Sequence, residues 1–413
     1  MGGPDRSEVD AAATRTAGAG AVAEPGRRFP PLEGGRRPRL LFVVTEDWYF
    51  VSHRLPHAAA AIEAGFEVAV ATRIGRHERL IRDSGLSLFP VSFNRSGIGP
   101  IEEMRTLAQL LRIYRRYAPD IVHQVALKPV VYGSIVARLA GVKGVVNALG
   151  GLGYVFSSQG RRARLLRNVA RPALKLALRG GNKRLIVQNE DDRRRIVEGR
   201  LADASSVRLI RGAGVDPQGY GRSDAASQPP LVVLPARLLR EKGVGEFVAA
   251  ARLLKARGVG ARFALVGQPD TMNPASVMQQ EVDDWVAEGA VEAWGWRDDM
   301  PAVLAQTQIA CLPTYYGEGL PKSLLEAAAS GCALVATDIP GCREIVRHEE
   351  TGLLVPSRDP EALADALQRL IANPELRLTY GDAARRLVES DFSMRRVVGE
   401  TLDIYAELQD RRA

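Results

Sequence analysis

The stretch that decides the fold spans residues 315–344 and reads YYGEGLPKSLLEAAASGCALVATDIPGCRE. An apolar run at residues 309–312 precedes it, a second at residues 333–336 lies inside it, and a helical pattern of Leu and Ala separates the two runs. This order predicts a strand, a helix and a second, parallel strand. We expect Glu318 in the turn before the helix and Glu326 on the helix, about one and a half turns from its start.

The same segment has the features of a nucleotide-sugar site. Pro321 suits the first position of a helix, so the amides of Gly319 and Leu320 are predicted at a positively polarised helix start that can take a diphosphate. The carboxylates of Glu318 and Glu326 can accept hydrogen bonds from a sugar ring and a ribose. For Glu326 alone, a solvated helix position remains an equal alternative.

The segment resembles the E-x7-E signature of retaining glycosyltransferases of family 4, whose two Rossmann-like domains form the GT-B architecture. Residues 233–243 read VLPARLLREKG and resemble the family's strand followed by an arginine and a Lys-Gly pair. Residues 211–216 read RGAGVD and resemble its interdomain glycine turn. The likeness runs from Arg39 to the C-terminus and is strongest to bacterial members that extend a sugar on undecaprenyl diphosphate.

The resemblance implies an α/β fold of the GT-B type, with two doubly wound domains whose parallel sheets face each other across a cleft. It implies a hexosyltransferase that moves a hexose or N-acetylhexosamine, with retention, from a UDP-sugar to a saccharide linked to undecaprenyl diphosphate. Such enzymes build surface glycans such as lipopolysaccharide O-antigen, capsule or exopolysaccharide. Two alternatives stay open: a nonhydrolysing sugar-nucleotide epimerase of the same architecture, and a glycosyltransferase with a soluble acceptor.

The resemblance also implies roles for particular residues of the second domain. Arg237 and Lys242 would hold the leaving diphosphate, Glu318 would orient the sugar, and these three together with His123 are the candidate catalytic residues. The implied donor-binding set is Gly214, Arg237, Lys242, Gly267, Trp296, Arg297, Glu318, Gly319, Leu320, Pro321, Ser323 and Glu326. The competing interpretations are an ordinary surface pair for Arg237 and Lys242, and packing for Trp294 and Trp296.

No metal site is expected. The chain has no Asp-x-Asp element in a suitable loop, since Asp298 and Asp299 are adjacent, and Asp298 is predicted to cap the following helix. We therefore predict activity without a divalent ion or other cofactor.

The first domain carries weaker signals, which we interpret as the acceptor site. Many family members have a pair of glycines after the first strand, but residues 45–56 read TEDWYFVSHRLP, which puts the usual role of this loop in doubt. We expect His123 and Lys128 at the end of the fourth strand, where ligands of parallel sheets bind. The predicted acceptor-binding residues are His53, Arg54, Lys128, Gly150 and Gly151. A structural histidine at position 53 and a plain tight loop at the glycines are the alternatives.

Apolar runs that alternate with helical patterns predict the domain organisation. We expect a disordered tail (1–37), an acceptor domain (38–216), a linker (217–230), a donor domain (231–392) and a last helix (393–413) that returns to the first domain. The predicted strands are residues 39–45, 66–72, 86–91, 121–123, 144–148, 185–188 and 207–210 in the first domain, and 231–236, 261–266, 291–294, 309–312, 333–336 and 353–355 in the second.

Composition agrees with a two-domain intracellular protein. The chain has 413 residues and 46% hydrophobic residues, enough for sizeable cores. Cys311, Cys332 and Cys342 form no C-x-x-C pair, and no export signal is present, so a reducing cytoplasm is predicted. No apolar stretch reaches the length needed to span a bilayer, so any attachment to the inner face of the plasma membrane is expected to be peripheral.

Charge is distributed unevenly along the chain. Residues 39–219 contain 29 Lys and Arg against 15 Asp and Glu, whereas residues 220–413 contain 21 against 28. A basic first domain favours an anionic partner. Nucleic acid is not expected, because few aromatic residues accompany the basic ones.

Nine basic residues and no acidic one lie between Arg161 and Arg184. On a helix, a basic stripe would face away from an apolar side that includes Leu176 and Ala177. We predict contact with an anionic membrane, and the alternative is a helix that packs on the sheet with a solvated basic side. Pro172 is expected to bend or interrupt this helix.

Overall fold

The computed structural model describes residues 28–93, 99–151, 161–180, 182–223, 228–271 and 273–410, and within 161–169 it describes the backbone only. The chain divides into two compact units: unit 1 is Met1–Gly214 with Met394–Ala413, and unit 2 is Val215–Ser393. Every predicted strand is present, with its ends displaced by two residues at most.

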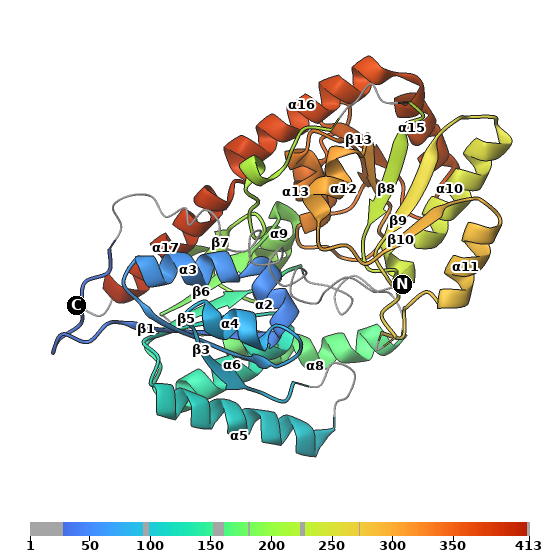
Figure 1. Cartoon of the computed structure of the whole chain (residues 1–413). Coiled ribbons are helices and arrows are strands. Elements are labelled where there is room, and N and C mark those ends of the chain that lie inside the picture. The colour runs from blue at the N-terminus through green and yellow to red at the C-terminus, as the bar shows by residue number, and fades with distance from the viewer. Residues whose placement is uncertain are drawn as a thin grey trace, which may run out of the picture. The chain divides into compact units, whose positions relative to one another are not determined.

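Unit 1 is built on a seven-stranded parallel sheet with the strand order β3-β2-β1-β4-β5-β6-β7 (Figure 1). The order reverses between β1 and β4, which is where doubly wound sheets bind ligands beyond the carboxyl ends of their strands. The central strands are almost wholly buried, as both faces of the sheet are covered. The strands are β1 (Arg39–Glu46), β2 (Glu67–Arg73), β3 (Ser87–Pro90), β4 (Ile121–Val125), β5 (Gly144–Ala148), β6 (Lys183–Val187) and β7 (Val207–Leu209).

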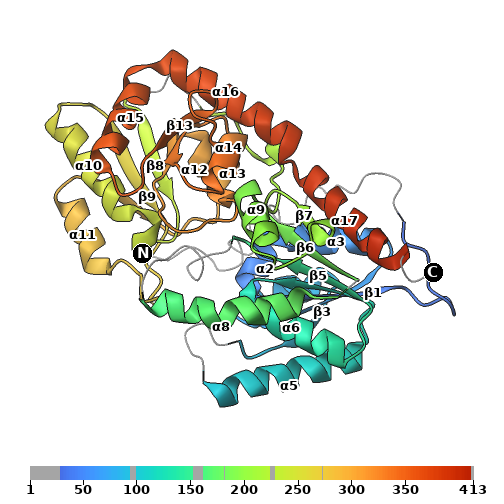
Figure 2. The same ribbon diagram turned by 180° about the vertical axis from the view of Figure 1, so that it is seen from behind.

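Helices cover both faces of this sheet. One core contains Phe42 of β1, Phe50 of α2 and Tyr405 of α17, and joins the helices α2 (Asp47–His53), α3 (Leu55–Glu63), α4 (Glu78–Asp83) and α17 (Met394–Asp410) to the sheet. On the other face lie α5 (Pro100–Tyr117), α6 (Leu127–Leu139), α8 (Arg161–Leu178) and α9 (Glu190–Glu198). Figure 2 shows α5, α6 and α8 as neighbouring helices of this second layer.

Unit 2 repeats the plan with a six-stranded parallel sheet of order β10-β9-β8-β11-β12-β13. Its strands are β8 (Leu231–Pro235), β9 (Arg262–Val266), β10 (Glu292–Gly295), β11 (Ile309–Leu312), β12 (Ala333–Thr337) and β13 (Gly352–Val355). One face packs on α10 (Val244–Ala256), α11 (Gln279–Ala287) and α15 (Pro360–Ala372), and the other on α12 (Met300–Ala305), α13 (Lys322–Ala329), α14 (Cys342–Ile345) and α16 (Pro374–Asp391). Short 3-10 turns are η1 (Ala204–Ser206), η2 (Pro217–Gly219) and η3 (Arg240–Lys242). The three cysteines are buried, as predicted for Cys311 and Cys332.

The prediction of a disordered tail to residue 37 is wrong for its described part. Phe29 is 7% exposed, its ring lies 4.5 Å from that of Phe66, and its backbone N–H donates to the Ala64 carbonyl. Arg36 makes two hydrogen bonds to Asp120. The burial of the Phe29 ring in the core holds the chain in place before the first strand, because an aromatic side chain buries a large apolar surface. The rest of the predicted tail, residues 1–27, lies outside the described residues.

The segment predicted as a linker belongs in large part to unit 2. Residues 217–219 form η2, the Ser223 N–H donates to the Ser330 carbonyl, and Arg222 forms an ion pair with Asp382. Residues 224–227 lie outside the described part of the chain. The Gly, Ser and Pro residues correctly indicated irregular backbone here, but they gave no sign that this backbone packs against unit 2.

The basic segment between Arg161 and Arg184 also folds differently from the prediction. It forms one helix, α8, with Pro172 inside it, and then enters β6, where Arg184 is 2% exposed and pairs with Glu407 of α17 at 2.9 Å. On α8 the buried side chains include Leu174 and Leu178, whereas Leu176 is 49% exposed. Leu176 therefore does not belong to the apolar side as predicted. Across the described residues, no helix is long and apolar enough to cross a membrane.

Candidate active site

The loop after β8 carries the two predicted cations of unit 2. Arg237 lies two residues after the end of the buried strand β8, and Lys242 ends η3. Gly243 then turns the chain into α10 with φ +76, and a Cβ there would lie 2.1 Å from the Pro313 carbonyl oxygen. Only glycine fits this approach, so the Lys-Gly pair keeps the lysine against the loop that follows β11.

Lys242 and Glu318 form an ion pair, and both side chains are largely buried. The Thr314 hydroxyl lies 3.2 Å from the same Glu318 oxygen, and it donates to the Glu241 carbonyl at 2.9 Å. The Tyr315 N–H donates to that carbonyl as well, at 3.0 Å. These bonds connect two loops and fix the carboxylate beside the ammonium group. The structure thus brings together two predicted residues that are 76 positions apart in the sequence.

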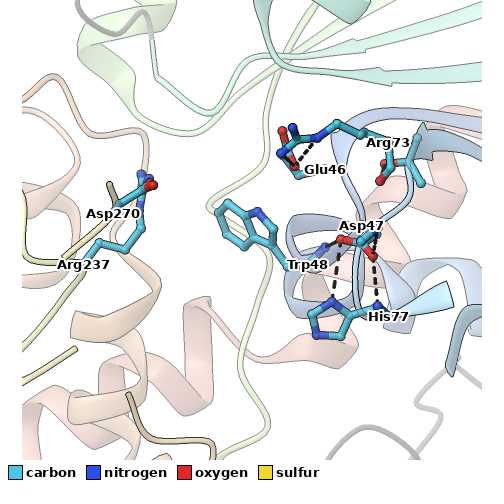
Figure 3. Close-up of polar contacts among 9 residues, drawn as sticks. Glu46, Asp47, Trp48, Arg73, His77, Arg237 and Asp270 are labelled. Atoms are coloured by element: carbon cyan, nitrogen blue, oxygen red, sulfur yellow. Dashed lines mark hydrogen bonds and ion pairs between the residues drawn. The ribbon is translucent and has the colours of Figure 1, made fainter. Parts of the chain in front are cut away.

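Arg237 has a partner that the sequence did not indicate. Its guanidinium donates to the Asp270 carboxylate at 2.9 Å, and Figure 3 shows the two side chains next to each other. Asp270 lies in the loop after β9, which begins with Gly267 at φ +150. A Cβ on Gly267 would lie 1.9 Å from the Ala236 carbonyl oxygen, so the predicted Gly267 lies against the backbone that precedes Arg237.

The start of α13 lies one residue later than predicted. Pro321 is the N-cap, with φ −67 and ψ 111, and the first helical residue is Lys322, followed by Ser323. Proline fits because its fixed φ suits this extended position and it has no N–H to leave unpaired. Gly319 and Leu320 lie buried just before the cap, and the amides at the helix start itself belong to the residues after Pro321.

Gly341 supports this loop from the neighbouring turn. Its φ is +51, and a Cβ there would lie 2.4 Å from the Gly319 carbonyl oxygen and 2.8 Å from that of Glu318. The turn before α14 is therefore in direct contact with the loop that carries the carboxylate.

Glu326 lies on α13 and is 9% exposed, so it is not a solvated helix position. Its carboxylate lies 3.0 Å from the Lys322 ammonium group, one turn earlier. Tyr220 also reaches it: burial, followed by the Glu326 charge and a hydrogen bond to that carboxylate, raises the pKa of the Tyr220 hydroxyl. A buried carboxylate with two partners is a fixed acceptor for hydroxyl groups.

The residues after β10 are less buried. Trp296 is 50% exposed, and Arg297 forms two hydrogen bonds with Asp299, whose pKa this guanidinium lowers. The N-cap of α12 is Asp299 and not Asp298 as predicted, and its side chain makes no capping bond because Arg297 holds it. Trp294 is partly buried and packs against a small core. No group of three or more His, Cys, Asp or Glu suited to a metal ion occurs within the described ranges.

In unit 1, two carboxylates lie where β1 passes into α2, Glu46 at the end of the strand and Asp47 at the start of the helix. Asp47 accepts hydrogen bonds from the N–H groups of Gly75 and His77, at 2.7 and 2.9 Å, and lies 3.7 Å from the His77 ring (Figure 3). Glu46 pairs with Arg73 at 2.7 Å. These two residues connect the junction of β1 and α2 to the end of β2 and the loop that follows it.

Two of the predicted acceptor residues meet at Tyr49 of α2. The Tyr49 ring stacks on the His53 ring with a centroid distance of 4.1 Å. A Cβ on Gly150, after β5, would lie 3.5 Å from the Tyr49 hydroxyl. Gly151 follows with φ +95. Lys128, at the start of α6, is paired with Glu103 of α5 at 2.8 Å, a partner that the sequence did not reveal.

His123 lies in the middle of β4 and not at its end as predicted, and it is fully buried. Its Nδ1 is 2.6 Å from the Tyr405 hydroxyl of α17, and its ring stacks on Phe42. We therefore assign it a structural position in the core of unit 1 and propose no contact between His123 and a substrate. Arg54, the other predicted residue in this region, is 2% exposed.

Gly214, predicted to bind the donor, lies in unit 1. A Cβ there would lie 2.7 Å from the Met394 Cα, at the start of α17, and its φ is +76. Close packing against α17 accounts for this glycine.

Two family models match the chain, one to each unit. Residues 39–189 match the family described as glycosyl transferase 4-like, and residues 229–373 match glycosyl transferases group 1. With two doubly wound parallel sheets, the fold and these matches define a glycosyltransferase of the GT-B architecture. The first unit thus contains a glycosyl transferase 4-like domain, and the second contains a domain of the glycosyl transferases group 1.

Curated relatives extend over most of the chain. This chain is 27% identical over 352 residues to the N,N'-diacetylbacillosaminyl-diphospho-undecaprenol α-1,3-N-acetylgalactosaminyltransferase of Campylobacter jejuni. The match covers 82% of this chain and 91% of the relative. The chain is 24% identical to the UDP-Gal:α-D-GlcNAc-diphosphoundecaprenol α-1,3-galactosyltransferase of Escherichia coli, with 79% and 85% covered.

Solved structures share the fold at lower identity. Sucrose-phosphate synthase from Thermosynechococcus elongatus has a TM-score of 0.75 at 21% identity, with 91% of this chain and 100% of that chain covered. HepE from Anabaena, in complex with UDP and glucose, has a TM-score of 0.71 at 16% identity, with 89% and 99% covered.

Proposed function

We propose that the protein is a retaining, metal-independent glycosyltransferase that moves a hexose or N-acetylhexosamine from a UDP-sugar to a saccharide linked to a polyprenyl diphosphate. The observation that carries the donor half is the Lys242–Glu318 ion pair, next to the start of α13 in the domain matched by the group 1 model. The names of two relatives support the acceptor half, since both act on diphosphoundecaprenol-linked sugars.

The proposed chemistry follows from the charges in unit 2. The bond between the donor's anomeric carbon and the diphosphate breaks, and Lys242, Arg237 and the helix start stabilise the departing charge, because fixed cations and dipoles need no reorganisation during the reaction. The acceptor hydroxyl forms the new bond on the same face and gives its proton to the leaving phosphate. Glu318, held by Lys242, orients the sugar, and Glu326 holds the ribose. These protein cations take the place of a divalent ion.

Isothermal titration calorimetry with a panel of nucleotide diphosphates tests the donor site. We expect heat of binding with UDP or a UDP-sugar in the presence of EDTA, because no metal is needed. Transfer to short polyprenyl diphosphate sugars then tests the acceptor, and the anomeric configuration of the product tests retention. If no uridine or guanosine diphosphate species binds, the donor site is refuted.

The proposal also includes contact of unit 1 with an anionic membrane. On the layer formed by α5, α6 and α8, large apolar side chains are exposed: Ile101 77%, Met104 66%, Leu139 64% and Leu176 49%. On α8 the exposed Leu176 directly follows the exposed Lys175. Apolar groups that can enter a lipid interface, next to cations that attract anionic headgroups, suit peripheral docking. Arg164 and Arg167 have no described side chains.

Liposome flotation checks this docking surface. Substitution Leu176→Glu together with Lys175→Glu should lower the fraction bound to anionic vesicles, and neither side chain is buried, so folding should be preserved. Arg252→Glu in unit 2, also exposed, serves as the matched control for a change of charge. Equal flotation of all three proteins would remove the docking proposal and leave the transferase proposal intact.

A further inference from the structure

Arg54 is a buried arginine without a counter-charge. It lies between α2 and α3, it is 2% exposed, and its Nε has no hydrogen-bond partner. Among the described residues, no hydrogen bond or ion pair involves its guanidinium group, although the other buried arginines, Arg184 and Arg377, are paired or bonded. An arginine keeps its positive charge in proteins, and a buried charge without a partner is strongly unfavourable.

The polar groups around Arg54 are unsatisfied as well. His57 of α3 is 1% exposed, and neither of its ring nitrogens has a partner. His123 uses Nδ1 for the Tyr405 hydroxyl, but its Nε2 has no partner. The structure therefore places four buried nitrogen atoms without partners on Arg54, His57 and His123, in a core that is otherwise apolar.

The cluster has a net positive charge. Burial, followed by the nearby charge of Arg54, lowers the pKa of His57 and of His123 well below the usual range. Both rings are therefore neutral near pH 7, and Arg54 contributes a single charge. Buried waters could satisfy the hydrogen bonds, but water cannot neutralise the guanidinium. An anion would do both.

We propose that Arg54 and His57 form a receptor for one phosphate group, and that this group belongs to the acceptor's diphosphate. The assignment to the acceptor rests on the proposed function. A guanidinium binds two phosphate oxygens at once, and the neutral His57 ring can donate one further N–H. Arg54 is also the N-cap of the nine-residue helix α3, whose start favours negative charge.

The probe for this site is inorganic pyrophosphate, added to the full-length protein saturated with UDP so that unit 2 is occupied. We expect calorimetric binding to the wild-type protein, about tenfold or more weaker binding to Arg54→Gln, and an intermediate loss in Arg54→Lys. Arg79→Gln is the matched control, because Arg79 is in the same unit and its side chain is 89% exposed. No binding to the wild-type protein, or equal binding to Arg54→Gln, would overturn the proposal.

Two further measurements keep the test decisive. If Arg54→Gln does not fold, NMR of labelled histidine rings in the wild-type protein tests the site instead. Pyrophosphate should shift the His57 signals and leave the signals of the exposed His348 unchanged. Unchanged His57 signals would refute the site. Geranyl diphosphate, which carries the same group on a short lipid chain, should bind at least as tightly as pyrophosphate. Weaker binding would exclude the lipid-linked acceptor as the source of the phosphate. Failure of UDP to bind would instead refute the donor site, and pyrophosphate binding could then be measured without UDP.

Discussion

The Lys242 ammonium group binds the Glu318 carboxylate and so joins the end of η3 to the loop before α13. The two residues come from segments that follow neighbouring strands, β8 and β11, which pair in the sheet. Their contact neutralises each charge in the absence of substrate. A donor diphosphate would compete for the lysine, and the carboxylate would then be available to the sugar.

Lys242→Ala should lower kcat by about 100-fold or more, because it removes a fixed cation from the departing diphosphate. The KM for the acceptor should change little. Arg240→Ala is the matched control: Arg240 is in the same η3 turn, but it is exposed and pairs with Glu281 at the surface. Steady-state kinetics of both variants checks the assignment. Full activity of Lys242→Ala would contradict it.

Gly341→Ala should weaken UDP binding and lower activity, because the added Cβ would collide with the carbonyl groups of Glu318 and Gly319. Gly258→Ala is the control for backbone strain alone. Its φ of +72 is also positive and so also unfavourable for alanine, but no atom lies within 4 Å of the added Cβ. Both variants should lose stability from the backbone term, Gly341→Ala the more because its ψ of −49 lies outside the left-handed region, and only Gly341→Ala should lose affinity in calorimetry. Equal affinities would show that this contact does not position the loop.

Glu326→Ala should raise the Kd of UDP about tenfold or more, since charged hydrogen bonds to a ribose are lost. Tyr220→Phe removes only the hydroxyl that contacts this carboxylate. We expect a smaller loss of UDP affinity from Tyr220→Phe, with the same sign. If Tyr220→Phe binds UDP normally while Glu326→Ala does not, Tyr220 has no part in orienting the carboxylate.

The fold was predictable because parallel strands that are covered on both faces are short apolar runs. Leu231–Pro235 and Ile309–Leu312, for example, are entirely buried and consist almost wholly of apolar residues. Such runs identify strands without any knowledge of their neighbours. The packing of Phe29 was missed because a single aromatic residue in a Gly- and Pro-rich tail has no periodicity.

The site residues that lie in a recognisable sequence motif could be predicted. Those that lie outside any motif, and that reach the site only when the chain folds, could not. Lys242, Glu318 and Glu326 lie in segments with recognisable spacing. Asp270 and Tyr220 do not, because their partners are reached only through folding. His123 was placed at the end of a strand because apolar residues alone defined β4, whereas Gln124 and Val125 extend the strand beyond it.

Unit 1 should lose stability below about pH 6.5, and His57 should account for part of this loss. Its pKa in the folded protein is lowered by burial and by Arg54, whereas an unfolded histidine titrates near 6.5. As the pH falls through that value, the unfolded chain takes up a proton that the folded chain does not, so each such histidine costs up to about 1.4 kcal/mol per pH unit. Above pH 6.5 both states are neutral and the term vanishes.

Hydrogen exchange of α3 between pH 5 and pH 8, corrected for the intrinsic rate and without phosphate in the buffer, measures this dependence. His57→Gln changes the absolute stability through packing, so the informative quantity is the difference between its slope and that of the wild-type protein. We expect a shallower slope for His57→Gln, because Gln does not titrate, and an unchanged slope for His348→Gln in unit 2. Parallel slopes for wild type and His57→Gln would mean that His57 takes up its proton at the same pH in the folded and unfolded chains. Below that pH, Arg54 would then lie beside a second buried positive charge. Inorganic pyrophosphate should lessen the wild-type slope, because an anion beside Arg54 offsets the charge that disfavours protonation of His57.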